Sequence, residues 1–290
     1  MKQEQAAPAA LNKEVYIKVR GLTYAYNRGT PQEQIALYNV DLDIYKGEFL
    51  ALVGANASGK STLIRHFNAL LTPLEGAVTV DGMDSALEDN LWEIRQRVGM
   101  VFQNPDNQIV SSLVEEDVAF GVENLGLPSD QVRARVEEAL SLTGLTEFRQ
   151  HAPHMLSGGQ KQRLAIAGVL AMRPQCLALD EPSSMLDPVG RRELMEIILD
   201  LNRSKGVTVI LATHFMEEAA LADRALIMSA GRIVLGGAPA EVFRDEDAIH
   251  SVGLELPFTA KVANSLKRRG VLLPEEGIVD LKDLVSYLCR

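Results

Sequence analysis

The fold of this chain is decided by the stretch Gly54-Ala55-Asn56-Ala57-Ser58-Gly59-Lys60-Ser61. It matches the phosphate-binding loop pattern G-x-x-x-x-G-K-[ST] at every fixed position. An apolar run at 49–53 precedes the loop, and apolar residues at helical spacing follow it over 63–71. A strand, a glycine loop and a helix in this order aim backbone N–H groups and a helix N-terminus at phosphate. The stretch therefore predicts a nucleotide site rather than a glycine turn before an ordinary helix.

The residue types in this loop indicate which atoms would bind the nucleotide. Gly54 and Gly59 permit tight backbone conformations that a β-carbon would oppose. Lys60 places a compact positive charge against the β- and γ-phosphates, and the Ser61 hydroxyl can ligate Mg²⁺. Thr62 supplies the next hydroxyl at the predicted helix N-terminus.

Length and composition narrow the class of protein. The 290 residues suit one large domain with a smaller appendage, or two modest domains. A net charge of −10 argues against a nucleic-acid-binding surface, although a local basic patch stays open. The two cysteines, Cys176 and Cys289, cannot form a disulfide framework, which points to a reducing cytoplasm.

The sequence also predicts how its ends and its apolar runs behave. Residues 1–13 are rich in Ala, Gln and Pro and are expected to form a disordered tail. No apolar run reaches the roughly 18 residues that a membrane-spanning helix needs. Any role at a membrane is therefore expected to come through a partner.

Four polar residues follow predicted buried strands. They are Gln103, Asp180, Glu181 and His214, and each comes directly after an apolar run. In open α/β sheets, ligands bind at the carboxyl ends of parallel strands. Acids in this position support Mg²⁺ and position a water molecule in nucleotide hydrolases. A lone glutamine or histidine at a strand end is more often structural, but beside a phosphate loop the four together predict one site.

A second glycine turn, Leu156-Ser157-Gly158-Gly159-Gln160, precedes a predicted helix. Ser157 is a natural N-cap, and the two glycines leave backbone N–H groups open to an anion. By itself, a Ser-Gly-Gly turn before a helix is a weak signal.

Alternating residues ahead of the phosphate loop predict a small antiparallel sheet, with strands near 15–19, 22–26 and 35–44. Tyr24 and Tyr26 share one face of the second strand. From spacing alone, simple packing of both rings is favoured over stacking of one of them on an adenine.

Outside the strands, a helix, a hairpin and a C-terminal appendage are predicted. Charged and apolar residues are interspersed over Ser129–Leu142 as on a solvated helix, and a hairpin is expected near 225–235. From about residue 240 the pattern changes to short helical stretches broken by proline and glycine. An appendage of about 50 residues is too small for a comfortable core of its own, so it is expected to pack on the main domain or on a partner.

Taken together, these motifs resemble those of the ATP-binding cassette (ABC) ATPases over roughly residues 15–240. In that resemblance Gly54–Ser61 is the phosphate loop and Gln103 the glutamine of the Q-loop. Leu156–Gln160 matches the family signature LSGGQ, which other phosphate-loop families lack. Ala57 stands where the family commonly has glycine, which leaves less backbone freedom at this position.

The same resemblance covers the hydrolytic residues. Asp180 matches the second nucleotide motif, and Glu181 matches its catalytic acid. Ser184–Asp187 corresponds to the D-loop and His214 to the switch histidine. Tyr26 falls where the family has its adenine-stacking aromatic residue, which reverses the preference for simple packing.

The resemblance implies a fold and a set of boundaries. It implies an α/β fold of the ABC-type P-loop NTPase class, with a mostly parallel core sheet and an N-terminal antiparallel β-subdomain. The ATPase domain would cover 14–240, with a helical signature subdomain at about 104–172. A C-terminal helical dimerisation region would follow at 241–290.

The resemblance also implies ATP and Mg²⁺ as cofactors and a head-to-tail dimer in which the signature of one subunit caps the nucleotide of the other. Ser61 and Gln103 would ligate Mg²⁺, with Asp180 holding it through water. Glu181 would orient and deprotonate the attacking water, and His214 would stabilise the γ-phosphate. The implied nucleotide contacts are Tyr26, Gly54, Ala55, Asn56, Ala57, Ser58, Gly59, Lys60, Ser61, Thr62, Gln103, Leu156, Ser157, Gly158, Gly159, Gln160 and Asp187.

A longer segment is similar to the ATPase subunits of energy-coupling factor (ECF) transporters, which import vitamins and transition-metal ions. This segment is Val101–Leu127, VFQNPDNQIVSSLVEEDVAFGVENLGL. The tail from Glu241 is similar to the region such subunits use to dimerise, and Ser183–Pro188 is closer to the first of their two paralogous ATPases. The implied partners are a second ATPase, a transmembrane scaffold and substrate-binding membrane subunits at the cytoplasmic face of the cell membrane, with no nucleic acid.

Three other functions compete with this interpretation. The ATPase of another ABC importer is the nearest, and the segment after the Q-loop and the tail argue against it. A soluble ABC protein acting on ribosomes or DNA would often carry two cassettes or a coiled-coil insert and a basic surface. A phosphoryl-transferring kinase would leave the signature Leu156–Gln160 unexplained.

Overall fold

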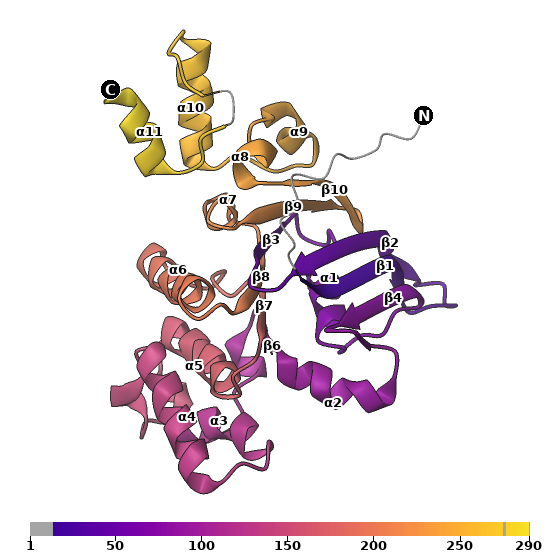
Figure 1. Ribbon diagram of the computed structural model, residues 1–290, viewed down its shortest axis with the longest axis vertical. Helices are drawn as coiled ribbons and strands as arrows, with labels where there is room; N and C mark the ends of the chain where they lie inside the picture. The colour runs from indigo at the N-terminus through magenta and orange to yellow at the C-terminus, as the bar shows by residue number, and fades with distance from the viewer. Residues whose placement is uncertain (1–13, 275–276, 290) are drawn as a thin grey trace.

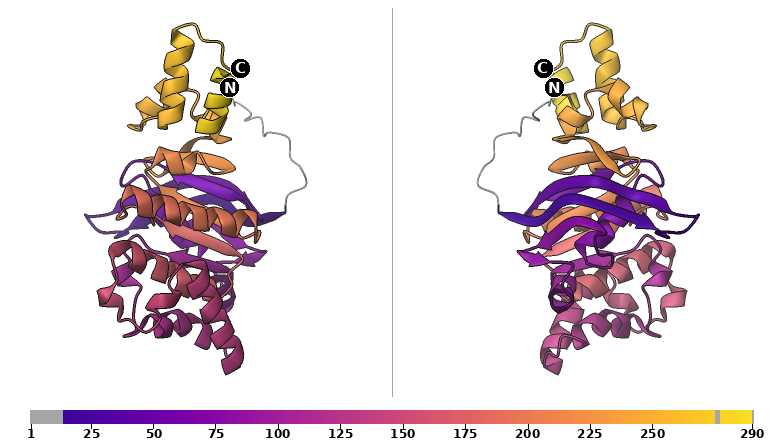
Figure 2. Two further views of the ribbon diagram at one scale, coloured as in Figure 1. Left: turned by 90° about the vertical axis from the view of Figure 1, so that its left-hand side faces the viewer. Right: turned by 90° about the vertical axis from the view of Figure 1, so that its right-hand side faces the viewer.

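The computed structural model of this protein describes residues 14–274 and 277–289. The disordered tail expected at 1–13 lies outside the described residues. Two sheets form the middle of the molecule, with one group of helices beneath them and a C-terminal helical group above (Figures 1 and 2).

The central sheet of the described chain has six strands in the order β10-β9-β3-β8-β7-β6. Strands β9, β3, β8, β7 and β6 run parallel, and β10 pairs with β9 in an antiparallel hairpin. The mostly parallel core sheet and the hairpin are thus confirmed. The strand bounds are β3 Phe49–Val53, β6 Val98–Val101, β7 Cys176–Asp180, β8 Thr208–Thr213, β9 Arg224–Ser229 and β10 Arg232–Gly237.

The second sheet is antiparallel and has the order β2-β1-β4-β5. Its bounds are β1 Val15–Tyr26, β2 Gln34–Tyr45, β4 Glu75–Val80 and β5 Met83–Asp84. The two strands expected at 15–19 and 22–26 are one continuous strand, β1. Its register shifts between Val19 and Leu22, where Gly21 has φ +56°. Such an irregularity breaks the sequence alternation without ending the strand.

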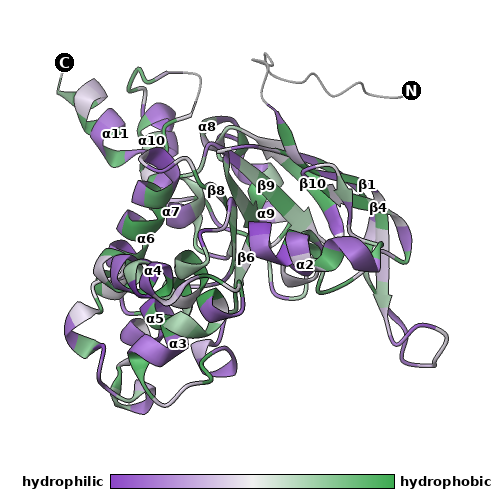
Figure 3. Cartoon of the chain, turned by 60° about the horizontal axis from the view of Figure 1, so that its bottom comes forward, coloured by the Kyte–Doolittle hydropathy of each residue, from purple (hydrophilic) through white to green (hydrophobic). Residues whose placement is uncertain are grey.

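Alternate residues of the central strands enter two different cores. In β3, Phe49, Ala51 and Val53 join one cluster, whereas Leu50 and Leu52 join the other. Because side chains point to opposite faces at every second residue, a strand covered on both faces must be apolar throughout. Figure 3 shows apolar residues concentrated on these central strands.

One face of the central sheet is covered by α5 and α6, and the other by α1 and the antiparallel sheet, whereas α3 and α4 pack against α5 below the sheet (Figure 1). Short 3₁₀ turns, η1 to η3, precede or connect helices of the lower group. The bounds are α1 Lys60–Phe67, α2 Glu88–Arg97, η1 Pro105–Asn107, α3 Val114–Glu123, α4 Ser129–Leu142, η2 Thr146–Phe148, η3 Pro153–Met155, α5 Gly158–Ala171 and α6 Pro188–Arg203.

Helix α4 has the predicted bounds, whereas α2 and α3 were not predicted. In α3 the buried residues Val114, Val118 and Val122 recur every four positions, a helical spacing that the many acids of this segment obscure. Helix α2 buries only Ile94, so it has almost no apolar periodicity.

The C-terminal part contains α7 Met216–Ala219, α8 Pro239–Val242, α9 Glu246–Ser251, α10 Phe258–Arg268 and α11 Leu281–Leu288. Val242, Phe243, Ile249, Leu254 and Leu256 are buried in the core of the main domain. A separate small cluster joins Ala263, Ile278 and Leu284. Within the described residues, no helix has both the length and the apolar character to span a bilayer.

Candidate active site

The phosphate loop joins the end of β3 to the start of α1, as the motif requires. Its backbone is too close-packed for side chains at the two fixed glycines. A β-carbon at Gly54 would lie 2.5 Å from the carbonyl oxygen of Met228, and one at Gly59 would lie 2.7 Å from that of Ala36. Ala57 has φ +62°, a left-handed conformation that costs an alanine about 1–2 kcal/mol. The methyl group is therefore accommodated, but with the reduced freedom expected from the sequence.

The Lys60 ammonium lies buried at the centre of the loop. It donates hydrogen bonds to the carbonyl oxygens of Gly54 at 2.7 Å and Ala55 at 3.2 Å. Its Nζ atom is 3.4 Å from Glu181 Oε1, and only 4% of the side chain is exposed. A buried cation with these neighbours keeps its charge directed into the loop, where a phosphate would bind.

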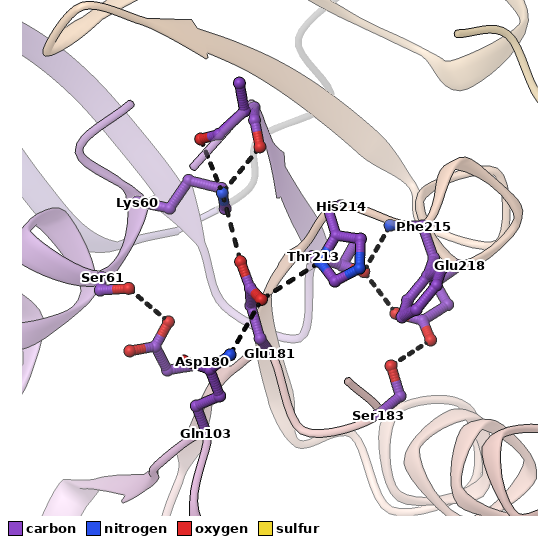
Figure 4. Close-up of polar contacts among 12 residues, drawn as sticks. Lys60, Ser61, Gln103, Asp180, Glu181, Ser183, Thr213, His214, Phe215 and Glu218 are labelled. Carbon is purple, nitrogen blue, oxygen red and sulfur yellow. Dashed lines mark hydrogen bonds and ion pairs between the residues drawn. The ribbon is translucent and has the colours of Figure 1, made fainter. Parts of the chain in front are cut away.

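Ser61 and Asp180 lie together, as predicted. The Ser61 hydroxyl donates to Asp180 Oδ1 over 2.7 Å (Figure 4). Burial raises the pKa of Asp180, whereas the Ser61 hydrogen bond and the charges of Arg65 and Lys60 lower it. Such a carboxylate gains from a nearby divalent cation, which favours its charged form.

These oxygen donors fit Mg²⁺, which prefers carboxylate, hydroxyl and phosphate oxygens. Among the described residues, no three His, Cys, Asp or Glu side chains are close enough to hold a metal ion. An ion here would therefore depend on nucleotide phosphates for part of its coordination, which is the usual situation for Mg²⁺.

Glu181 is the hub of the site. Its Oε2 accepts hydrogen bonds from Gln103 Nε2 at 3.4 Å and from His214 Nδ1 at 3.1 Å (Figure 4). The backbone is left-handed at Glu181, with φ +48°, and its N–H donates to the Ala212 carbonyl on β8 at 2.9 Å. Strained backbone of this kind is common where a side chain must be aimed at a ligand. Of the four polar residues expected at the strand ends, Gln103 and His214 thus meet at the Glu181 carboxylate, and Asp180 directly precedes it in the chain and binds Ser61.

Tyr26 is half-buried beside the start of α1. Its hydroxyl lies 3.2 Å from Thr62 Oγ1, and its ring makes an edge contact with Tyr24, with centroids 5.1 Å apart. Tyr24 in turn contacts the buried His66 ring at 4.9 Å. The Tyr26 ring is therefore fixed next to the phosphate loop. Stacking on adenine stays a prediction.

The signature lies away from the phosphate loop, at the start of α5. Ser157 and Gln160 form a reciprocal capping box, in which the Ser157 hydroxyl accepts from the Gln160 N–H and the Gln160 side chain accepts from the Ser157 N–H. Leu156 is buried, while Ser157 and Gly158 are exposed. Within the described chain, no hydrogen bond joins these residues to the phosphate loop. This exposure leaves the helix N-terminus open to another molecule.

Asp187 is the N-cap of α6, where its side chain accepts a hydrogen bond from the Gly190 N–H at 2.8 Å. Its carboxylate is thus engaged locally within the D-loop. The nucleotide contact that the sequence assigns to Asp187 stays a prediction.

The β9–β10 turn supports the phosphate loop, a role that the sequence did not reveal. The Gly231 N–H donates to the Ser58 carbonyl at 3.0 Å, and the Gly231 carbonyl accepts from the Tyr38 N–H at 3.0 Å. Gly231 has φ +74°, and a β-carbon there would lie 2.7 Å from the Ala36 carbonyl oxygen. In the sequence this glycine looks like an ordinary hairpin residue.

Gly231→Ala is expected to weaken ATP binding several-fold and to lower the free energy of unfolding by about 1–3 kcal/mol, from left-handed strain and a backbone clash. ATP titration and denaturant unfolding would measure the two effects. Gly206→Ala is the matched control, because Gly206 has φ +69° and no described heavy atom within 4 Å of an added β-carbon. Unchanged ATP affinity in the Gly231 variant would contradict the supporting role.

The C-terminal segment reaches the site as well. A cavity of about 700 Å³ is lined on one side by Ala55, Gln103, Glu181 and His214, and on the other by residues between 253 and 261. The Phe258 N–H donates to Glu217 Oε1 at 3.4 Å across this junction. No local sequence pattern signals this contact, because it depends on packing between distant segments.

Comparison with known proteins agrees with this geometry. The family described as ABC transporter matches residues 37–184. The energy-coupling factor transporter ATP-binding protein EcfA1 of Symbiobacterium thermophilum is 56% identical, and the alignment covers 95% of this chain and 97% of that protein. The EcfA1 protein of Clostridium novyi is 50% identical, over 96% of this chain and 99% of that one.

Solved structures are similar too. The structure of cbiO1 from Clostridium perfringens, described as part of the ABC transporter complex cbiONQ, has a TM-score of 0.74 and 39% identity, covering 88% of this chain and 100% of that one. The bacterial ABC transporter cassette MJ0796, solved as a dimer, has a TM-score of 0.71 and 33% identity, covering 77% of this chain and 98% of that one. The chain therefore belongs to the ABC transporter ATP-binding proteins and, among these, to the energy-coupling factor group.

Proposed function

We propose that this chain hydrolyses ATP to drive an energy-coupling factor importer of vitamins or transition-metal ions through a transmembrane partner. The observation that supports hydrolysis most directly is the Glu181 carboxylate, which accepts from Gln103 and His214 and faces the Lys60 ammonium. A phosphate-release assay of the purified chain with ATP and Mg²⁺ tests the ATPase activity.

Electrostatic positioning accounts for the rate in such a site, because phosphoryl transfer requires little covalent chemistry from the protein. The Lys60 ammonium and the loop N–H groups hold the phosphates. The Glu181 carboxylate orients a water molecule and accepts its proton. Ser61, Gln103 and Asp180 would hold Mg²⁺, which supplies positive charge to the phosphate oxygens when bound.

His214 has a role that follows from its tautomer. Its Nδ1 donates to Glu181, so its Nε2 can donate to a γ-phosphate oxygen only when the imidazole is protonated. A protonated His214 would stabilise both the Glu181 carboxylate and the negative charge that develops on the γ-phosphate.

The segment Asn104–Val114, which follows Gln103, is our candidate for the contact with the membrane partner. It is held to the signature helix α5 by Gln108, whose Nε2 donates to the Ala165 carbonyl at 3.2 Å while its Oε1 accepts from the Phe102 N–H. An ion pair of 2.7 Å between Lys161 and Asp106 adds a second connection. Val110 in this segment is 65% exposed. A partner that docks here would therefore contact a segment linked both to Gln103 and to the signature.

Val110→Glu is expected to reduce recovery of the membrane partner at least tenfold, because a buried unpaired charge at an interface is costly. The ATPase activity of the purified chain should stay within twofold of wild type. Val234→Glu, on the exposed face of β10, is the matched control. Normal recovery of the partner with Val110→Glu would contradict this docking site.

The C-terminal region 241–290 is proposed to hold the ATPase dimer together. Leu281, Val285 and Leu288 are exposed and recur along one face of α11, which suits contact with a second ATPase subunit. We propose that this subunit is a paralogue, and that the assembly sits peripherally on the cytoplasmic face of the membrane. Exposed signature residues, open to another molecule, support the head-to-tail arrangement.

Affinity purification of the tagged chain from detergent-solubilised cells, followed by mass spectrometry, tests the assembly. A second ATPase with a transmembrane scaffold and small membrane proteins is expected. Another kind of permease would favour a different ABC importer. Ribosomal proteins would favour the soluble class instead.

A further inference from the structure

Behind the catalytic acid lies a second carboxylate, Glu218 on α7, which the hydrolytic site does not use directly. It is 2% exposed, although glutamate is seldom fully buried without partners. Its Oε2 accepts from Thr213 Oγ1 at 2.6 Å, and its Oε1 accepts from Ser183 Oγ (Figure 4). Both hydroxyl residues are buried as well.

These two partners belong to the two loops that meet in the active site. Ser183 follows Glu181 by two residues and directly precedes the D-loop, and Thr213 directly precedes His214. On the side of the catalytic residues, the two loops are joined by the hydrogen bond from His214 to Glu181. The Glu181 N–H also donates to the Ala212 carbonyl near the end of β8, and the Glu218 carboxylate adds a side-chain connection through Ser183 and Thr213. The Glu218 carboxylate therefore acts together with the pairing of β7 and β8 in fixing how far Glu181 lies from His214.

A cation completes the arrangement. Arg191, in the first turn of α6, has its Nε 3.9 Å from Glu218 Oε1, and its guanidinium lies 3.4 Å from the centre of the Phe215 ring. Burial raises the pKa of Glu218, while the two hydroxyl donors and the charge of Arg191 lower it. The Thr213 hydroxyl also accepts from the Phe215 N–H at 3.0 Å, so it has its own hydrogen left to donate.

We propose that Glu218 is a positioning residue that keeps Glu181 and His214 in their reactive arrangement and couples the D-loop to the switch histidine. The proposal rests on the ATPase activity proposed above. A carboxylate accepts from both hydroxyls at once with its two oxygens, whereas an amide offers one acceptor oxygen and one donor NH₂ group. Glutamine at this position would therefore keep the volume of the side chain but lose the negative charge and one of the two hydrogen bonds donated by a hydroxyl, because that hydroxyl would have to turn and accept from the amide instead.

Glu218→Gln is expected to lower the turnover number about 10- to 100-fold, as displacement of a catalytic group by a fraction of an ångström does. The dissociation constant for ATP should stay within twofold, because the polar partners described for Glu218 are Ser183, Thr213 and Arg191, none of which belongs to the phosphate loop. Ser183→Ala and Thr213→Val remove one connection each. Each should reproduce part of the loss, and combining either with Glu218→Gln should add little.

Glu196→Gln is the matched control, since Glu196 is exposed on α6 and carries the same charge. The measurements are turnover, ATP affinity and melting temperature for the wild-type and variant chains. Turnover of Glu218→Gln within twofold of wild type would overturn the proposal, as would a fall in turnover matched by equal losses of ATP affinity. If Glu218→Gln does not fold, turnover and ATP affinity of Ser183→Ala and Thr213→Val test the proposal by the same criteria. A wild-type chain without ATPase activity would instead reject the proposed function.

Discussion

Glu181→Gln is expected to lower ATP turnover by about 10²- to 10⁴-fold and to leave ATP binding intact or tighter. A glutamine cannot accept the proton of the attacking water. Its amide oxygen can still accept from Gln103 and His214, so the hydrogen bonds that hold the site together survive. The loss should therefore be confined to the chemical step.

The negative charge of Glu181 explains why ATP binding should not weaken when this residue is replaced. The Glu181 carboxylate lies 3.4 Å from the Lys60 ammonium, so it competes with phosphate for that cation. Removing the carboxylate frees Lys60 from this competing charge and removes a like charge from beside the γ-phosphate.

Phosphate release and ATP titration measure the two effects of Glu181→Gln separately. Glu196→Gln on α6 serves as the control, with both quantities expected to match the wild type. Near-normal ATP hydrolysis by Glu181→Gln would contradict the assignment of Glu181 as the general base. A parallel loss of ATP binding would mean that the carboxylate supports the loop rather than the reaction.

This site could be predicted from the sequence because each of its parts is recognisable from a short stretch of neighbouring residues. A sequence motif identifies the phosphate loop by itself, and Gln103, Asp180 and His214 each follow or end an apolar strand. Parallel strands bring such residues to one edge of the sheet, so their proximity follows from topology alone. The fold class followed for the same reason.

The supporting residues could not be found in this way. Gly231 and Glu218 act through contacts with Ser58 and Ser183, which lie far away in sequence. In the sequence the first is a turn glycine and the second an acid in a helical run. The contact of the 253–261 segment with the active-site cavity likewise depends on packing. Helix α3, in contrast, could have been predicted from the sequence, since its valines recur every four residues.

Gly158→Asp is expected to lower ATP turnover by about 10²- to 10³-fold while leaving ATP binding by the chain's own phosphate loop unchanged. The new carboxylate would stand at the N-terminus of α5. There it should stabilise the helix by about 0.3–1 kcal/mol, because negative charge favours this end of the helix dipole. No described heavy atom lies within 4 Å of an added β-carbon at Gly158, so the chain should fold. A fall in activity without a fall in stability would separate function from fold.

The cause of the loss would lie in the partner subunit's site. Ser157 and Gly158 are exposed, and the N–H groups at this helix terminus are proposed to meet the γ-phosphate bound by the other subunit. A fixed negative charge there would repel that phosphate and keep the altered signature from completing the site it faces. Gly158→Ala adds the same β-carbon without charge and is the matched control. Equal turnover by the Asp and Ala variants would contradict the role of the signature as a phosphate cap.

Mixing the two inactive variants, Gly158→Asp and Glu181→Gln, tests the head-to-tail arrangement where the chain pairs with itself. In a mixed dimer, the Glu181 of the first variant faces the intact signature of the second, so one site is complete. Half of the dimers are mixed at a one-to-one ratio and each has one working site, so about a quarter of the wild-type turnover should return. If the signature served its own subunit's nucleotide, both sites of every dimer would be defective. No activity would then return on mixing.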